Sequence, residues 1–139
     1  MKRRFVLMAT ALVKNRGQYL LLRRSKNNRT DVNKWQFPEG KTDFGETPIE
    51  TLKRELKEET NLNLINAKLL GWYSSVTHYP GLGTGHQIRL LYKCKISGKV
   101  EISEEHDDFG WFDLNGIRKL DLAKNFDFKD VRKVLEELT

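Results

Sequence analysis

Hydrophobic and polar residues alternate along several stretches of this 139-residue chain, and such alternation predicts β-strands. The predicted strands cover residues 5–14, 18–22, 66–78 and 86–97, and residues 15–17 form a turn between the first two. A short aromatic strand is expected to end at Trp111 and Phe112. Residues 80–85 are rich in glycine, so we interpret that segment as a flexible hairpin loop.

A helix is predicted over residues 48–60 because both of its ends carry strong signals. Thr47 is a good N-cap, Pro48 suits the first helical position, and Glu50 completes a capping box with Thr47. Asn61 tolerates the left-handed conformation that ends many helices. Local sequence therefore defines where this helix begins and ends.

Two further helices are expected near the C-terminus. A short one begins near Asp113, and the final one spans residues 128–138 with Asp127 as its cap. Apolar residues recur at helical spacing along the final helix, which predicts a core-facing stripe and no catalytic role. These residues are Val131, Val134, Leu135 and Leu138.

Side-chain directions on the 48–60 helix single out its glutamates. Its apolar face is formed by Ile49, Leu52 and Leu56, and the neighbouring face by Glu55, Glu58 and Glu59. Glu59 projects only about 20° from Leu52, so we expect it at the edge of the core. A carboxylate there should be paired, protonated or bound to metal. The alternative is a solvated helix whose basic residues pair with these glutamates, but the preceding glycine loop favours a metal site.

Residues 40–62 resemble the Nudix box, G-x5-E-x7-R-E-U-x-E-E-x-G-U, in which U is a bulky aliphatic residue. The matching residues are Gly40, Glu46, Arg54, Glu55, Leu56, Glu58, Glu59 and Leu62. Asn61 replaces the last glycine, and asparagine is the next best residue for a left-handed helix end. Residues 35–40 look like the family's strand and loop before the box, although Glu39 stands where many members have glycine.

The resemblance implies one Nudix domain over residues 1–139, folded as an α/β/α sandwich with a mixed central β-sheet. The box helix would cover one face of the sheet and the C-terminal helix the other. The hydrophobic pattern alone indicates only an α+β or α/β protein. A chain of this length suits one compact domain with a modest core.

The activity implied by the resemblance is hydrolysis of phosphoric anhydride bonds. We expect an Mg²⁺-dependent pyrophosphohydrolase that cleaves a nucleoside diphosphate linked to another group, by water attack on phosphorus. Nucleoside triphosphates and dinucleoside polyphosphates are the expected substrates, and Mn²⁺ is an alternative ion. Two alternatives stay open: a catalytically silent nucleotide sensor on the same fold, and an RNA 5′-end pyrophosphohydrolase. A general nucleic-acid-binding module ranks last, because the chain has no RNA-recognition signature.

Oxygen ligands suit Mg²⁺, and the box provides several of them. Glu55 and Glu59 are the expected principal metal ligands, joined by Glu58, by Glu46 for a second ion, and by the carbonyl of Gly40. We expect Arg54 to orient a glutamate through charge-assisted hydrogen bonds.

The family also implies a carboxylate from the acidic loop before the Trp111 strand. Glu105 is the preferred residue and Glu104 the next. The general base is then either Glu105 or a glutamate of the box. The candidate catalytic residues are accordingly Arg54, Glu58, Glu59 and Glu105.

A net charge of +6 points to anionic partners and is compatible with a nucleotide. Arg23 and Arg24 end a strand, so their side chains should leave it on opposite faces and one should reach the phosphates. Lys41 is a second candidate for neutralising phosphate charge. The loops around Trp35 and Tyr79 are expected to contact the rest of the substrate.

No membrane span is expected, because no apolar run approaches the roughly 20 residues that a helix needs to cross a bilayer. The apolar residues 5–13 follow three basic residues, but they are interpreted as a strand and not as a signal peptide. A single cysteine, Cys94, excludes an internal disulfide and is expected in the core. We expect a cytoplasmic monomer or homodimer.

Overall fold

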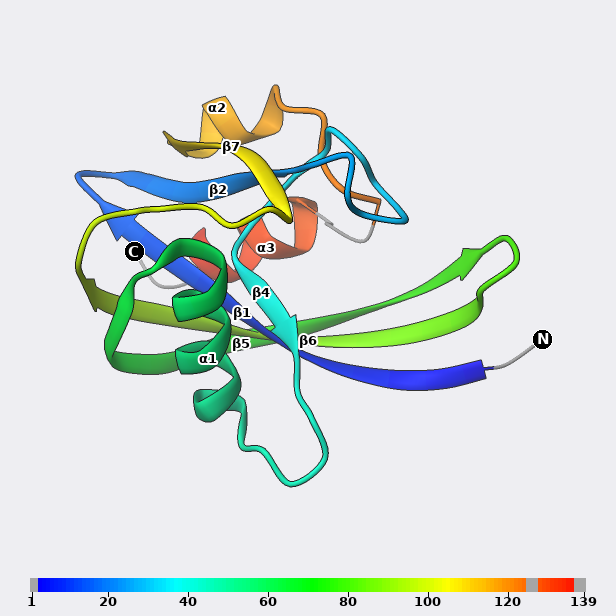
Figure 1. Ribbon diagram of the computed structural model, residues 1–139. Coiled ribbons are helices and arrows are strands. Elements are labelled where there is room, and N and C mark those ends of the chain that lie inside the picture. The colour runs from blue at the N-terminus through cyan, green and yellow to red at the C-terminus, as the bar shows by residue number, and fades with distance from the viewer. Residues whose placement is uncertain (1–2, 125–127, 137–139) are drawn as a thin grey trace.

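Two strands that lie far apart in the sequence pair in parallel and organise the fold. The computed structural model describes residues 3–124 and 128–136, shown in Figure 1. Its strands are β1 (Arg3–Asn15), β2 (Gln18–Arg24), β3 (Trp35–Gln36), β4 (Glu39–Lys41), β5 (Asn63–Tyr79), β6 (Gly83–Ser97) and β7 (His106–Phe112). Its helices are α1 (Pro48–Thr60), α2 (Leu114–Arg118) and α3 (Phe128–Glu136).

The sheet is mixed, as predicted. Its strand order is β3-β2-β1-β6-β5, while β4 pairs with β1 and β7 pairs with β2. β1 runs parallel to β6, and the other strand pairs are antiparallel. β1 therefore joins the two halves of the sheet, and it lies between β4 and β6, the strand that carries Arg89.

Half of the predicted glycine loop at residues 80–85 is strand. Gly83 and Gly85 belong to β6, opposite Tyr79 and Thr77 of β5, so only residues 80–82 form the turn. Cross-strand pairing over the long β5–β6 hairpin overrides the weak strand preference of glycine. The hairpin and the start of β1 extend beyond the helices (Figure 1).

Helix α1 has the predicted ends. Thr47 Oγ1 accepts a hydrogen bond from the Glu50 backbone N–H at 3.2 Å, and Asn61 ends the helix with φ of 61°. Leu52 is buried, but Ile49 is 42% exposed, so its predicted place in the core is wrong. Ile49 lies in the first turn, before the part of the helix that contacts the sheet.

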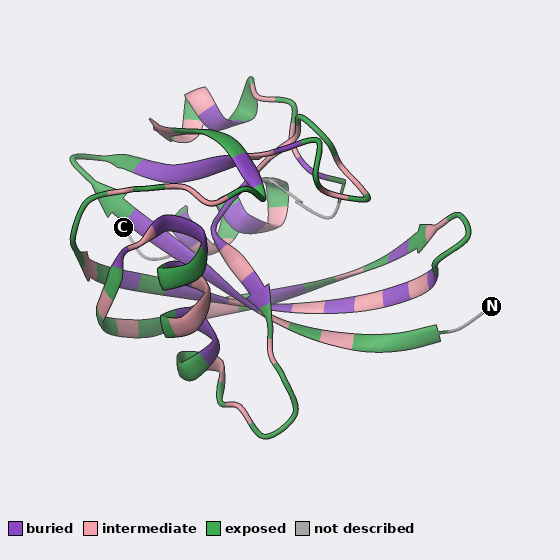
Figure 2. Cartoon of the chain, in the orientation of Figure 1, coloured by how far each residue is buried: buried purple, intermediate pink, exposed green. Residues whose placement is uncertain are grey.

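Two hydrophobic clusters lie on opposite faces of the sheet, and Figure 2 shows the buried segments between the helices. The first contains Leu52 and Leu56 of α1 together with Cys94, which is buried as expected. The second contains Val131 and Leu135 of α3. This arrangement is the α/β/α sandwich predicted from the resemblance.

The two helices predicted near the C-terminus lie only partly within the described residues. Asp113 caps α2 as expected, accepting a hydrogen bond from the Gly116 backbone N–H at 2.7 Å. Asp127 and Leu138 lie outside the described residues. Within the described ranges, no helix has both the length and the apolar character that crossing a membrane requires.

Candidate active site

The close approach of β4 to α1 forms the base of the site. Gly40 is buried in β4 and pairs with Ala9 of β1. A Cβ at Gly40 would overlap the side chain of Glu55, so only glycine leaves room for this carboxylate beside the strand. Glu55 is half-buried, and burial raises its pKa although Arg54 opposes the shift.

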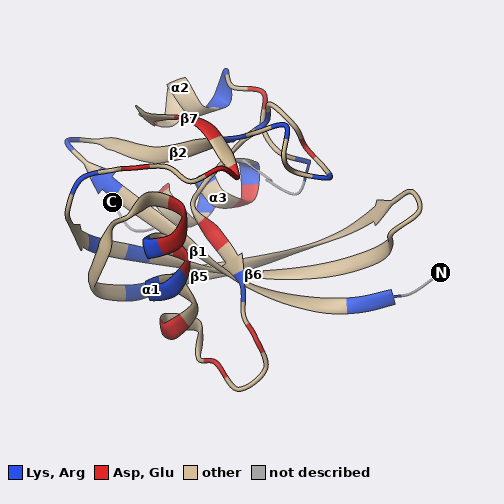
Figure 3. Ribbon diagram, in the orientation of Figure 1, with Lys and Arg blue, Asp and Glu red and all other residues tan. Residues whose placement is uncertain are grey.

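Glu59 is the most deeply buried of the box glutamates. It is 3% exposed, and its Oε1 accepts a hydrogen bond from the backbone N–H of Glu39 at 3.1 Å. Burial raises its pKa well above the ordinary value, and the charges of Glu55, Glu39 and Glu105 add to the shift. Figure 3 shows the acidic positions of α1, β4 and the segment entering β7 lying near one another.

Arg54 holds two of the acidic residues in place. Its Nε and Nη2 donate to the two carboxylate oxygens of Glu46 at 2.9 Å each, and its Nη1 donates to Glu55 Oε1 at 2.6 Å. The hydrogen bonds from Arg54 and then from Thr51 lower the pKa of Glu46 to about 2. These are the contacts that an orienting residue makes, and the orienting role itself stays a prediction. The predicted role of Glu46 at a second ion also stays a prediction.

A second element brings another carboxylate to the site. Ligand atoms of Glu59, Glu105 and His106 all lie within 4.8 Å of one another. Glu105 is exposed, and its backbone carbonyl accepts hydrogen bonds from the Ser25 N–H and from Asn28 Nδ2. These bonds anchor the loop that carries Glu105. Glu58 lies on the exposed side of α1, with its carboxylate 3.6 Å from Arg54.

His106 was not among the predicted site residues. It is 4% exposed, and its Nε2 lies 4.0 Å from Glu59 Oε2. Burial and then the charge of Arg24 lower its pKa to about 4, so His106 is neutral near pH 7. Its place directly after Glu105 was the one signal in the sequence.

The donor set fits a divalent cation. Among the described residues, His106 is the only basic side chain within 4.0 Å of Glu59, and it is neutral. Burial and then the neighbouring charges of Glu55, Glu39 and Glu105 raise the pKa of Glu59, so its ionised form needs a positive charge that the described residues do not supply. Several carboxylate oxygens around one point are the environment that Mg²⁺ and Mn²⁺ prefer.

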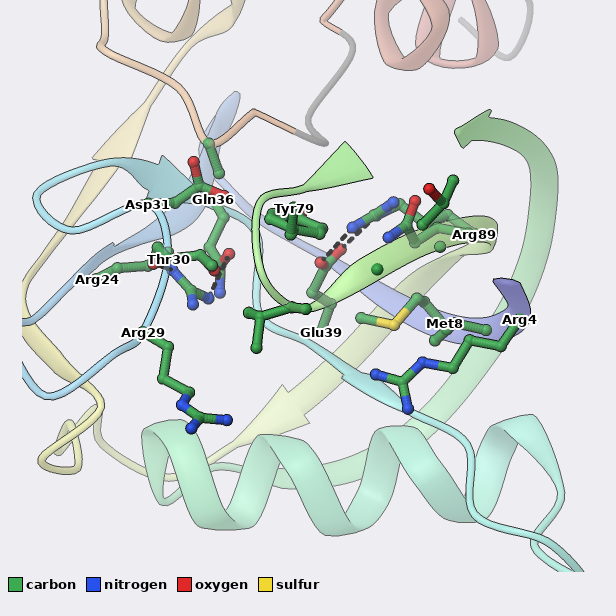
Figure 4. Close-up of a pocket in the computed structure, with 17 residues that line it drawn as sticks. Arg4, Met8, Arg24, Arg29, Thr30, Asp31, Gln36, Glu39, Tyr79 and Arg89 are labelled. Carbon is green, nitrogen blue, oxygen red and sulfur yellow. Dashed lines mark hydrogen bonds and ion pairs between the residues drawn. The ribbon is translucent and has the colours of Figure 1, made fainter. Parts of the chain in front are cut away.

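A cavity of about 410 Å³ is lined by Glu39, whose backbone N–H bonds to Glu59, but not by the box glutamates themselves. Arg24 and Tyr79 line it, as expected for substrate-binding residues, and Figure 4 shows them on its wall. Arg24 donates from Nε to the carbonyl of Thr30 at 3.0 Å and from Nη1 to Gln36 Oε1 at 3.3 Å. Its guanidinium is thus held in a fixed direction beside the cavity.

Three other expected substrate-binding residues do not line this cavity. Arg23 leaves the opposite side of β2, where its Nε donates to Asp107 Oδ1 at 2.7 Å and its guanidinium lies 5.9 Å from the Trp35 ring centre. Trp35 packs edge-on against Phe112 beside the second hydrophobic cluster. Lys41 is exposed on β4. The substrate-binding roles of Arg23, Trp35 and Lys41 stay predictions.

Glu39 has a partner, Arg89, that was not among the predicted site residues. Arg89 Nε and Nη2 donate to Glu39 Oε1 and Oε2 at 3.1 Å each. Both residues line the cavity. The unusual Glu39 was visible in the sequence, but its pairing with a residue of β6 was not.

Comparison with known proteins identifies the family to which this site belongs. A profile of the NUDIX domain matches residues 3–137. The chain belongs to the Nudix family. The nucleoside triphosphatase NudI of Klebsiella pneumoniae subsp. pneumoniae is 30% identical over 118 residues, which cover 80% of this Nudix chain and 84% of that protein.

Two further Nudix relatives agree with this assignment. The ADP-ribose pyrophosphatase of Methanocaldococcus jannaschii is 32% identical over 110 residues, covering 78% of this chain and 62% of that protein. The crystal structure of a MutT protein from Methanosarcina mazei Go1 superposes with a TM-score of 0.84 at 26% identity, covering 99% and 97% of the two chains. As a Nudix protein, the chain belongs among hydrolases of phosphoric anhydrides.

Proposed function

We propose that this protein is an Mg²⁺-dependent pyrophosphohydrolase of nucleotides that contain a diphosphate, with nucleoside triphosphates as the first substrates to test. The observation that carries the proposal is the buried Glu59, which lies near other carboxylates and has no charged basic partner among the described residues to stabilise its ionised form. The relative with 30% identity is named as a nucleoside triphosphatase, which supports triphosphates as the substrate class.

The proposed site residues divide into those that hold the metal ion and those that act on the substrate or on the attacking water. Glu55 and Glu59 hold the metal, with Glu58 and the carbonyl of Gly40 as further ligands. Arg54 orients Glu55 through their 2.6 Å hydrogen bond. When bound, Mg²⁺ supplies charge screening of the phosphate oxygens and lowers the pKa of a water ligand.

Glu105 is the proposed general base. Its carboxylate adjoins Glu59 and is exposed, so it can reach the water and pass the proton to solvent. Arg24 binds phosphate oxygens from the cavity side, because its guanidinium is already oriented by Gln36 and Thr30. The water attacks phosphorus, a P–O anhydride bond breaks, and Glu105 takes the proton that the water loses.

A substrate panel tests this proposal. Purified protein is assayed with Mg²⁺ or Mn²⁺ against nucleoside triphosphates, ADP-ribose, a dinucleoside tetraphosphate and 5′-triphosphate RNA, and the products are resolved to show which bond breaks. Glu59→Gln should lower kcat/KM by about a hundredfold or more, because losing a metal carboxylate costs several kcal/mol of transition-state stabilisation. Glu101→Gln, an exposed carboxylate outside the cluster, serves as the control and should stay within about threefold.

Retention of activity by Glu59→Gln within about threefold of wild type would reject the metal-ligand assignment. Tight nucleotide binding with no turnover of any panel member would instead favour the silent sensor. Turnover of the RNA alone would favour the RNA 5′-end alternative.

A further inference from the structure

The wall of the cavity is more basic than a neutral nucleoside requires. Sites for small organic ligands are mostly apolar, with a few polar groups that fix the orientation of the ligand. Tyr79 is the one aromatic residue of the described lining. The charged residues of the lining are Arg4, Arg24, Arg29, Arg89, Asp31 and Glu39. The excess of arginine points to an anionic part of the substrate.

Among the described residues, an ion pair neutralises one of these four arginines. Arg89 Nε and Nη2 donate to the two carboxylate oxygens of Glu39 at 3.1 Å each. The other acidic residue of the lining, Asp31, accepts a hydrogen bond from the Lys124 backbone N–H at 3.2 Å. In the part of the chain that the structure describes, no carboxylate oxygen lies within 4.0 Å of a side-chain nitrogen of the other three arginines. Their charge is therefore available to a ligand.

Arg29 is held beside Arg24 by its two neighbours in the chain. Arg24 Nε donates to the carbonyl of Thr30 at 3.0 Å. On the other side of Arg29, Asn28 Nδ2 donates to the carbonyl of Glu105 at 2.6 Å. Figure 4 shows Arg24, Thr30 and Arg29 on the same side of the cavity. The backbone of Arg29 is thus fixed relative to Arg24, although its side chain is exposed.

Two arginines without carboxylate partners on one wall suit a phosphate group. Their like charges raise each other's electrostatic energy, and an anion bound between them removes that cost. A phosphate monoester carries about two negative charges and three acceptor oxygens. The planar guanidinium can donate two parallel hydrogen bonds to such a group. The wall that carries Arg24 and Arg29 therefore matches phosphate better than it matches a neutral sugar or base.

The reacting diphosphate accounts for only part of this charge. In the proposed function the metal ion and Arg24 bind that diphosphate, which leaves Arg29 for a further anion. A phosphate on the 2′ or 3′ oxygen belongs to the same ribose as the 5′ diphosphate, so the arginine that binds it must lie near Arg24. Arg29 meets this condition through Thr30.

Arg4 is placed differently. It lies on the other side of the cavity in Figure 4. Along β1 it comes six residues before Thr10, the partner of Glu39, which is about 20 Å of strand. The far end of β1 carries Arg4, and we assign it no contact with the ribose.

We propose that Arg29 binds a phosphate monoester on the ribose of the substrate, at the 2′ or the 3′ oxygen. The substrate is then a nucleoside diphosphate compound that carries a further phosphate on its nucleoside. This inference rests on the proposed function, because it names the substrate class of the same site. Arg29 sets specificity and takes no part in the chemical step.

Two matched pairs of dinucleotide-like compounds test the inference. NADP⁺ and NAD⁺ differ only by a 2′-phosphate, and coenzyme A and dephospho-coenzyme A differ only by a 3′-phosphate. All four contain a diphosphate on the 5′ oxygen of adenosine. The wild type should prefer the phosphorylated member of at least one pair by about tenfold or more in kcat/KM. The pair that shows the preference identifies the oxygen that carries the phosphate.

The preference should fall to about threefold or less in Arg29→Met, which keeps the apolar stem of the side chain and removes the charge. Arg4→Met is the matched control, because it removes another cavity arginine and changes the net charge by the same amount. It should leave the ratio within each pair unchanged. The thermal midpoint reports whether each variant folds. A folded Arg29→Met variant with the wild-type ratio would overturn the inference, and so would an equal loss of preference in Arg4→Met.

Binding measurements separate this inference from the proposed function. If none of the four compounds is hydrolysed, their calorimetric affinities in EDTA still test recognition of the extra phosphate. Equal affinities within both pairs would overturn the inference, and a preference that Arg29→Met loses would support it. Hydrolysis of all four compounds at equal kcat/KM would leave the proposed function standing and reject the inference.

Discussion

Replacing Glu59 with glutamine should stabilise the metal-free protein while it abolishes metal binding. The Glu59 side chain is 5% exposed, and its carboxylate has the Glu39 N–H as a donor and a neutral His106 as its nearest basic neighbour. Folding must therefore either bury a charge that the described residues do not compensate or keep the carboxyl protonated at a pH where the unfolded chain ionises it, and both cost free energy. Glutamine keeps the acceptor oxygen for Glu39 and removes the charge.

The expected gain in the free energy of unfolding equals the cost of burying an uncompensated polar group, which is about 1–3 kcal/mol. A domain of this length unfolds with an entropy of about 0.3 kcal/mol per kelvin. Glu59→Gln should thus raise the thermal midpoint in EDTA at pH 7.5 by about 3–10 °C. The exposed Glu58 supplies the control, because Glu58→Gln should shift the midpoint by less than about 2 °C.

The dependence on pH and on metal gives two independent checks. The pKa of Glu59 is raised in the folded state, so the stability of the wild type falls as the pH rises from 4.5 to the raised pKa and stays at the lower value above it. The cost disappears as the pH falls toward the ordinary value of 4.5, and the two midpoints should then converge. Mg²⁺ should raise the midpoint of the wild type and not that of the variant. A midpoint for Glu59→Gln below the wild-type value in EDTA at pH 7.5 would refute this reasoning.

Three further outcomes are expected. Gly40→Ala should displace the Glu55 carboxylate and lower Mg²⁺ affinity by about tenfold or more, as measured by calorimetry. Unchanged affinity would contradict the role of the close approach between Gly40 and Glu55. Arg54→Lys should lower kcat/KM by about tenfold or more, because an ammonium group cannot reproduce the guanidinium hydrogen bonds to both Glu46 and Glu55. Wild-type kinetics would argue against orientation by Arg54. Burial raises the pKa of the Cys94 thiol to about 12, so a thiol reagent should label Cys94 only in denaturant. Rapid labelling of the folded protein would show that Cys94 is not buried.

Features set by neighbouring residues were predictable from the sequence. The ends of α1 depend on Thr47, Glu50 and Asn61, which act within one helical turn of each end. The burial of Glu59 followed from its angle to Leu52, because helical geometry fixes that angle. Ile49 was placed wrongly because the angle does not say how far along the helix the core extends.

Features set by strand pairing were not predictable in this way. Glu39 and Arg89 are 50 positions apart and meet only because β4 and β6 both flank β1. His106 reaches Glu59 through the pairing of β7 with β2. A single sequence does not specify the register of such pairings, although one residue of slip moves every side chain to the other face.

The hydrogen bond from the Glu39 backbone to Glu59 has a consequence for engineering. Since the main chain donates it, every residue except proline can supply the same bond from position 39. The side chains at positions 39 and 89 can therefore be exchanged together in a combinatorial library while the donor to Glu59 is retained. Such a library would vary the cavity wall independently of the carboxylates on α1.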